Sequence, residues 1–197
     1  MNEEIKVNKT RRNLVVATSV VGGAASVGAA VPFVVSMWPS ERAKAAGGPV
    51  EVDISKIAPG EMAVIEWRGK PVWVIRRTQE MLESLKKAAG NLTDPASKSS
   101  QQPEYAKNEY RSLKPEVVVM EGVCTHLGCS PQMKPADAKA EMGAEWAGGF
   151  YCACHGSKFD LAGRVFRGAP APTNLVVPPY TFLSDSTLLI GEDKKGA

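Results

Sequence analysis

The pattern of apolar and polar residues after position 50 predicts a mainly antiparallel β domain. Residues 50–54 alternate apolar and polar, as a half-buried strand does. Residues 62–67 and 71–75 are rich in β-branched side chains, and the short Arg68-Gly69 step between them predicts a hairpin. Further strand signals and turns complete the domain. The strands are expected at 116–120, 150–151, 164–166, 180–183 and 188–190, and the turns at Gly163 and Ser184-Asp185.

One short helix interrupts this pattern. Thr78 can cap it, and Gly90 can end it. Its apolar residues recur at helical spacing, at Met81, Leu82, Leu85, Ala88 and Ala89. The segment 91–115 that follows is rich in Ser, Gln, Lys and Pro, so we expect a long excursion over the surface.

A different pattern occupies the N-terminus, where residues 14–37 carry no charge. As a helix, these 24 residues rise roughly 36 Å, enough to cross a hydrocarbon core of about 30 Å. Arg11-Arg12 precede the run, and twin arginines before a weakly apolar stretch resemble a twin-arginine export signal. We therefore predict a cytoplasmic segment over 1–13 and a transmembrane helix over 14–38.

Two readings of this segment stay open at this point. The Ala43-Lys44-Ala45 sequence offers a small-x-small cleavage site, but the apolar run is longer than the core of a cleaved signal, which favours a retained anchor. Four basic residues precede the uncharged run and only two follow it closely, so the N-terminus is expected in the cytoplasm. The six are Lys6, Lys9, Arg11 and Arg12, then Arg42 and Lys44.

The rest of the chain is then expected outside the cytoplasm, where disulfides can form. Residues 39–49 mix charge, alanine and a Gly-Gly pair, and are interpreted as a hinge or tether with little structure of its own, or simply a spacer. The soluble domain is expected over 50–197. Four of the 24 basic and two of the 21 acidic residues precede Leu14, leaving 20 against 19, so the domain lacks the basic field that nucleic-acid binding needs.

Cysteine and histidine residues are confined to two short windows, CTHLGC and CACHGS. Each window, called a box here, supplies one Cys-His pair: Cys124 with His126, and Cys152 with His155. Both boxes follow strand-like segments, which places them on loops at strand ends. Two facing loops can then offer two thiolates and two imidazoles to a metal site. Zinc sites also use two cysteines and two histidines, but zinc fingers usually present a Cys pair and then a His pair.

The sequences CTHLGC and CACHGSKFDLAGRVF, followed by GAPAP at 168–172, resemble the Rieske iron-sulfur family, specifically the bacterial quinol:cytochrome c reductase subunit. The resemblance implies an all-β head, an antiparallel β-sandwich with a cluster-binding subdomain, behind a single N-terminal transmembrane helix. It also implies one [2Fe-2S] cluster held by Cys124, His126, Cys152 and His155. By the same resemblance, Cys129 and Cys154 form a disulfide, although spacing alone leaves the pairing of four cysteines open.

Further roles follow from the family resemblance. His155 is expected to meet the quinol and take its proton, and Ser157 to donate a hydrogen bond to a bridging sulfide. Many members carry Tyr at the position of Phe159, so the loss of that hydroxyl is expected to lower the reduction potential. Gly168 and Pro170 match a loop that covers the cluster, and Leu127 matches an apolar residue at the docking tip. The less favoured alternative for both features is plain packing.

The resemblance implies an inner-membrane subunit of a dimeric cytochrome bc1 complex with its cluster on the periplasmic side. By the same resemblance, the subunit is expected to take an electron and a proton from ubiquinol, or from menaquinol, near cytochrome b and to pass the electron to cytochrome c1. One alternative is the small Rieske subunit of another exported oxidoreductase such as arsenite oxidase. The other is a zinc-stabilised binding module.

Overall fold

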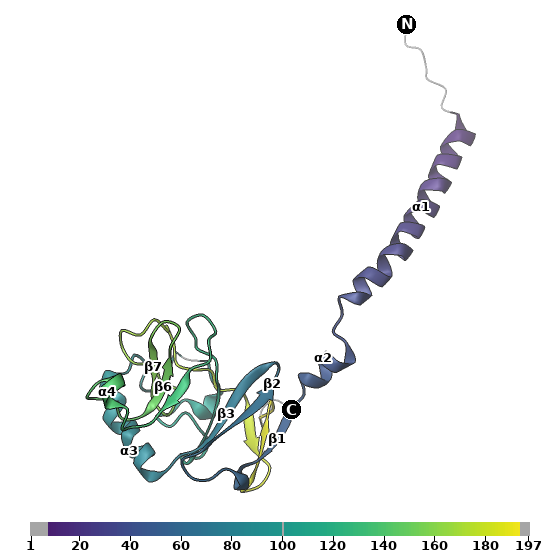
Figure 1. The fold of residues 1–197 in the computed structure, drawn as a ribbon. Helices are drawn as coiled ribbons and strands as arrows, with labels where there is room; N and C mark the ends of the chain where they lie inside the picture. Colours follow the sequence, from purple (N-terminus) through teal and green to yellow (C-terminus); the bar gives the residue numbers. More distant parts are fainter. Residues whose placement is uncertain (1–7, 100, 194–197) are drawn as a thin grey trace. The chain divides into compact units, whose positions relative to one another are not determined.

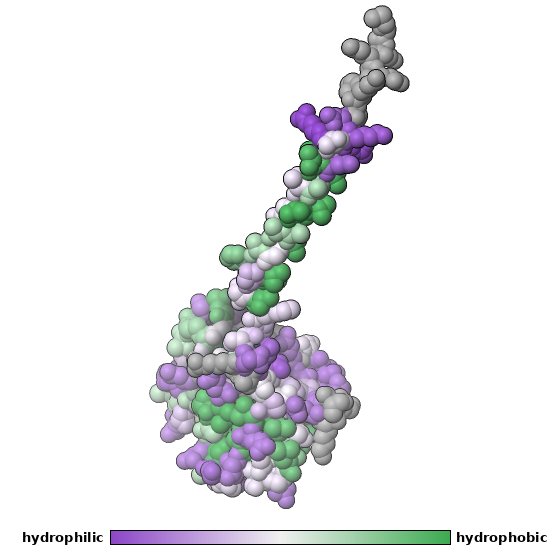
Figure 2. Space-filling model, turned by 90° about the vertical axis from the view of Figure 1, so that its right-hand side faces the viewer, coloured by the Kyte–Doolittle hydropathy of each residue, from purple (hydrophilic) through white to green (hydrophobic). Residues whose placement is uncertain are grey.

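A computed structural model describes residues 8–99 and 101–193, and the chain divides into two units between Ala45 and Ala46. The first unit contains the long helix α1 (Lys9–Ser36), which is drawn in Figure 1. Asn8 caps α1, because its side chain accepts a hydrogen bond from the backbone N–H of Arg11. None of the helix residues is buried. Figure 2 shows hydrophobic residues along this helix beyond a hydrophilic band at its N-terminal end.

The predicted apolar segment is therefore helical, and the helix also includes the twin arginines. A short helix α2 (Glu41–Ala46) follows, where the sequence predicted a tether with little structure of its own. Ser40 explains its start, since the hydroxyl accepts a hydrogen bond from the backbone N–H of Ala43. A 2.6 Å ion pair between Lys44 and Glu41 adds support across one turn.

The described residues of the second unit form a β domain of three antiparallel sheets with three strands each. The first sheet has the order β1-β9-β8, the second β2-β3-β4 and the third β5-β6-β7. The strands are β1 (Val50–Asp53), β2 (Met62–Trp67), β3 (Lys70–Arg76), β4 (Val117–Glu121), β5 (Gln132–Lys134), β6 (Gly149–Cys152), β7 (Ser157–Phe159), β8 (Tyr180–Phe182) and β9 (Thr187–Ile190). The helices of this unit are α3 (Gln79–Ala88) and α4 (Lys139–Met142), with 3₁₀ turns at Ile54–Lys56, Ala89–Asn91 and Glu104–Ala106.

The second sheet is the middle layer, and this explains the unbroken apolar run in β3. Val72 and Val74 belong to a core shared with Tyr180 and with Leu188 and Ile190 of the first sheet. Trp73 and Ile75, which point to the opposite face, belong to a second core with Phe150 and Phe159 of the third sheet, where Trp73 stacks on Phe150 with ring centroids 4.7 Å apart. A strand buried on both faces reads as continuously hydrophobic.

Most predicted elements are confirmed, including the β-sandwich, the 62–67/71–75 hairpin and the helix capped by Thr78. The expected strand at 164–166 is wrong as a strand, because Val165 and Phe166 make only isolated bridges to Phe159 and Leu92. The short strands β5 and β7 carry three residues each and were not predicted.

The segment 91–115 lies only partly on the surface, where its composition predicted a long surface excursion, because five of its described residues are buried. Leu92, Ser97, Ala106 and Arg111 are all fully buried within it. The polar residues among them can be buried because they find partners. Arg111, for example, donates to Gln102 and to three backbone carbonyls.

Candidate metal centre

Both Cys/His boxes lie on loops at strand ends, as predicted. The first box begins three residues after β4, and the second connects β6 to β7 as a hairpin loop, with Cys152 the last residue of β6 and Ser157 the first of β7. Paired strands therefore fix the two ends of the second loop, with Cys152 opposite Ser157 in the register.

The two boxes fold into the same turn. In the first, the backbone N–H of Gly128 donates to the carbonyl of Cys124 at 3.0 Å, and in the second, Gly156 donates to Cys152 at 2.9 Å. Both glycines have positive φ, +86° and +79°, a conformation that residues with a Cβ rarely adopt. Each turn holds its first cysteine and its histidine on one compact loop.

The predicted disulfide is confirmed, and it joins the tips of the two loops. Cys129 and Cys154 are bonded, with Cα atoms 6.7 Å apart and a sequence separation of 25. This pairing leaves Cys124 and Cys152 as the free cysteines.

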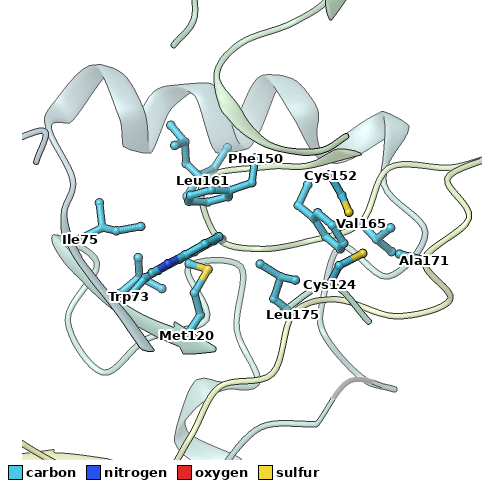
Figure 3. Close-up of a cluster of buried hydrophobic side chains, with 14 residues drawn as sticks. Trp73, Ile75, Met120, Cys124, Phe150, Cys152, Leu161, Val165, Ala171 and Leu175 are labelled. Atoms are coloured by element: carbon cyan, nitrogen blue, oxygen red, sulfur yellow. The ribbon is translucent and has the colours of Figure 1, made fainter. Parts of the chain in front are cut away.

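The free thiols are buried at one end of the core between the second and third sheets. Cys124 is 2% and Cys152 1% exposed, and Figure 3 shows both beside Val165 and Ala171. Burial raises the pKa of the Cys124 thiol, an effect partly offset by hydrogen bonds from the His126 backbone and the Ser157 hydroxyl. Two apposed buried thiols are suited to a metal, which replaces their protons on binding.

The two histidines lie together, with ring centroids 4.7 Å apart and ring planes at 89°. His155 is exposed, whereas His126 is half-buried. The Nδ1 atom of His126 is buried and has no hydrogen-bond partner among residues 8–99 and 101–193. A buried imidazole nitrogen without a partner costs free energy unless something binds it. Two free thiols and this nitrogen form a donor set that fits a Rieske cluster, in which histidines replace two cysteines.

A purely geometric grouping would choose different ligands. The Sγ atoms of Cys129, Cys152 and Cys154 lie within 4.8 Å of one another. Two of these sulfurs are bonded to each other, however, so neither can act as a thiolate. The chemistry of the sulfur atoms therefore excludes this trio and leaves only Cys152 from it.

The neighbouring residues singled out by the resemblance are placed as follows. Ser157 is fully buried, and its Oγ accepts a 3.0 Å hydrogen bond from the backbone N–H of Ala171. Phe159 is fully buried in the same core as the free cysteines. Gly168 and Pro170 are both exposed, in the loop that leads to buried Ala171.

Two contacts near the boxes were not predicted from the sequence. The Thr125 hydroxyl donates to the carbonyl of Thr173 at 2.7 Å, which ties the first box to the chain beyond the 168–172 loop. Arg111 reaches the carbonyl of Leu175 from the segment that was expected to lie on the surface. No periodicity marks Arg111, because an isolated arginine in a polar stretch gives no sign of burial.

Comparison with known proteins agrees with this geometry. The family model "Rieske [2Fe-2S] domain" matches residues 50–181, and the model "Ubiquitinol-cytochrome C reductase Fe-S subunit TAT signal" matches residues 1–40. The fold and the site therefore define a Rieske-type iron-sulfur protein. Together with helix α1, the second match indicates an exported, membrane-anchored chain.

Similar sequences narrow the class further. The ubiquinol-cytochrome c reductase iron-sulfur subunit of Allochromatium vinosum is 57% identical over 97% of this chain and 93% of its own length. The same subunit of Blastochloris viridis is 41% identical over 92% and 93%. The mitochondrial cytochrome b-c1 complex subunit Rieske-3 of Nicotiana tabacum is 42% identical over 81% of this chain and 52% of its own length.

The chain belongs to the family of ubiquinol-cytochrome c reductase iron-sulfur subunits. This confirms the reductase over the arsenite oxidase alternative, and it excludes the zinc-stabilised module.

Proposed function

We propose that Cys124, His126, Cys152 and His155 hold the [2Fe-2S] cluster. The observation that carries the proposal is the pairing of two buried free thiols with two adjacent imidazoles, one of which has an unpartnered buried nitrogen. The other two cysteines of the boxes, Cys129 and Cys154, are already bonded to each other and serve to hold the loops together.

When bound, the cluster supplies a one-electron acceptor, and two neutral imidazole ligands keep its potential far above that of all-cysteine clusters. The protein's own groups perform the rest. The exposed ring of His155 contacts the quinol and takes its proton. Leu127 follows His126 in the first box, and its side chain is 70% exposed. This side chain contacts the partner subunit at which the head docks. The chain from 168 to 173, tied to Ser157 and Thr125, covers the buried side of the site.

The relatives' names support a place in the cytochrome bc1 complex with ubiquinol as the donor. Within that complex we propose that the subunit passes electrons from cytochrome b's quinol site to cytochrome c1, with menaquinol as the alternative donor. We propose a dimeric complex in the bacterial inner membrane. Residues 14–38 span it, 1–13 stay in the cytoplasm, 39–49 form the tether and 50–197 form the periplasmic cluster domain. Protease added to sealed spheroplasts should digest the head and spare an N-terminal tag; protection of the head would refute the orientation.

The ligand set is tested by iron and labile sulfide in the purified membrane complex. Replacing Cys124 or Cys152 by Ser, or His126 or His155 by Ala, should abolish the cluster. Ala153→Ser is the matched control, because Ala153 is an exposed residue in the second box that offers no ligand. Full iron and sulfide content in a variant of any one of the four ligands would overturn its assignment.

A further inference from the structure

Three arginines are buried inside the head domain against one buried carboxylate. Arg77, Arg111 and Arg164 are 3%, 0% and 1% exposed, and Asp160 is fully buried. Of these, Arg164 pairs with Asp160 at 2.7 Å. In the described part of the head one further acid is buried, Glu121, which pairs with Lys70 instead.

Two more carboxylates, which lie closer to the solvent, interact electrostatically with the arginines. Half-buried Asp94 acts on Arg111, and exposed Glu116 acts on Arg77. Water screens such partners more strongly than it screens a buried one. The arginine group therefore carries excess positive charge within the protein interior.

The arginines converge on a single turn, residues 160–164, which follows β7. Arg77 donates to the carbonyl of Leu161 at 3.5 Å, and Arg111 to those of Ala162 at 3.1 Å and Gly163 at 3.4 Å. The Arg111 guanidinium also donates to the carbonyl of Leu175. Neutral side chains such as glutamine could donate to these carbonyl groups equally well. Hydrogen bonding alone therefore does not explain why positively charged arginines occupy these positions.

This turn contributes to the core in which the candidate cluster site lies. The side chains of Leu161, Ala162 and Leu175 belong to the same core as Cys124 and Cys152. Figure 3 shows Leu175 beside Cys124. The arginines donate hydrogen bonds to the backbone carbonyls of these same three residues.

Arg77 and Arg111 remain cations at neutral pH. Burial lowers the pKa of Arg77 and of Arg111 to about 10, with Asp160 acting in the opposite direction. Charges in a protein interior interact far more strongly than charges in water. A positive group near a redox centre favours the state that has gained an electron.

We propose that the buried guanidinium groups of Arg77, Arg111 and Arg164, offset mainly by Asp160, raise the reduction potential of the cluster. They act as positioning residues for the 160–164 turn and as a fixed positive field behind the site. This inference rests on the proposed ligand set, because the field acts on a cluster held at Cys124 and Cys152.

Opposite charge changes test the field. In the intact complex, redox titration followed by EPR should give a lower midpoint potential for Arg111→Gln and a higher one for Asp160→Asn. We expect a shift of roughly tenfold in the ratio of oxidised to reduced cluster, which is about 59 mV for a one-electron couple. Both variants break buried hydrogen bonds, so both should also lower the thermal unfolding temperature of the head.

The sign separates electrostatics from distortion of the fold. Lys56→Gln is the matched control: it removes a positive charge from a side chain that is 81% exposed, and should leave the potential unchanged. Arg77→Gln should lower the potential as Arg111→Gln does, and it provides a second reading if Arg111→Gln loses its cluster. Potentials that stay unchanged, or that move in the same direction for the arginine and aspartate variants, would overturn the proposal. Absence of a Rieske signal from the unmodified protein would instead contradict the ligand set.

Discussion

The backbone N–H of Ala171 donates a 3.0 Å hydrogen bond to the hydroxyl oxygen of Ser157. Ser157 thus uses its oxygen as an acceptor toward the 168–172 loop and keeps its own proton available for the site. Its hydroxyl also acts on the Cys124 thiol. A single buried side chain therefore connects the covering loop to a candidate ligand.

Replacing Ser157 by Ala should lower the midpoint potential, because a hydrogen bond to cluster sulfur stabilises the more negative, reduced state. The buried N–H of Ala171 would also lose its acceptor, at a cost of about 1–3 kcal/mol of folding stability. Redox titration and thermal unfolding measure the two effects. Ser157→Thr retains the hydroxyl and serves as the control. An unchanged potential in the Ala variant would show that the hydroxyl does not donate to the cluster.

The disulfide should be needed for a stable cluster. Replacing Cys129 or Cys154 by Ser opens a cross-link over 25 residues, a loss of roughly 3 kcal/mol by the loop-entropy estimate. The two loops would then be held together mainly by the cluster itself. Iron content and the unfolding temperature should both fall. Full occupancy with unchanged thermal stability would contradict this role.

Phe159 allows a test of potential tuning by gain of a hydrogen bond. Phe159→Tyr should raise the midpoint potential, because the new hydroxyl can donate to a cysteine sulfur that shares its core. Phe150→Tyr is the matched control: it adds the same hydroxyl to the residue paired with Phe159 across β6 and β7, but on a ring stacked against Trp73. An unchanged or lowered potential in Phe159→Tyr would defeat this account.

Leu127 should contribute to docking and not to the redox properties. Removing an exposed side chain that becomes buried in a complex costs about 1.5–3 kcal/mol, so Leu127→Ala should weaken productive docking roughly 10- to 100-fold. Quinol oxidation by the complex measures this at limiting quinol. Leu183→Ala is the control, since Leu183 is 52% exposed in the turn after β8. Equal effects of the two substitutions, or a changed potential in Leu127→Ala, would count against a docking role.

Sequence patterns predicted the parts of the fold that depend on local periodicity. The alternation in β1 and the capped helix α3 follow from residue spacing. The hairpin between β2 and β3 follows from the short Arg68-Gly69 turn, in which both residues have positive φ. The strands β5 and β7 have too few residues to show a period. The burial of Arg111 depends on carbonyl groups more than 50 residues away, which no local pattern reveals.

At the site, the sequence located the two boxes but could not pair their cysteines. The family resemblance supplied the pairing of Cys129 with Cys154, and the structure confirms it. The contact between Ser157 and Ala171 joins β7 to a separate loop. It could not be predicted because it depends on how the two boxes close over the core.

The most direct test of the central claim uses the fact that this chain contains only two histidines. If His126 and His155 both bind the cluster, labelling the protein with ¹⁵N-histidine labels every imidazole ligand and no other side chain. Pulsed EPR of the reduced protein should then show two distinct, strongly coupled ¹⁵N nuclei. One coupled nitrogen, or none, would contradict the mixed cysteine and histidine coordination on which the account depends.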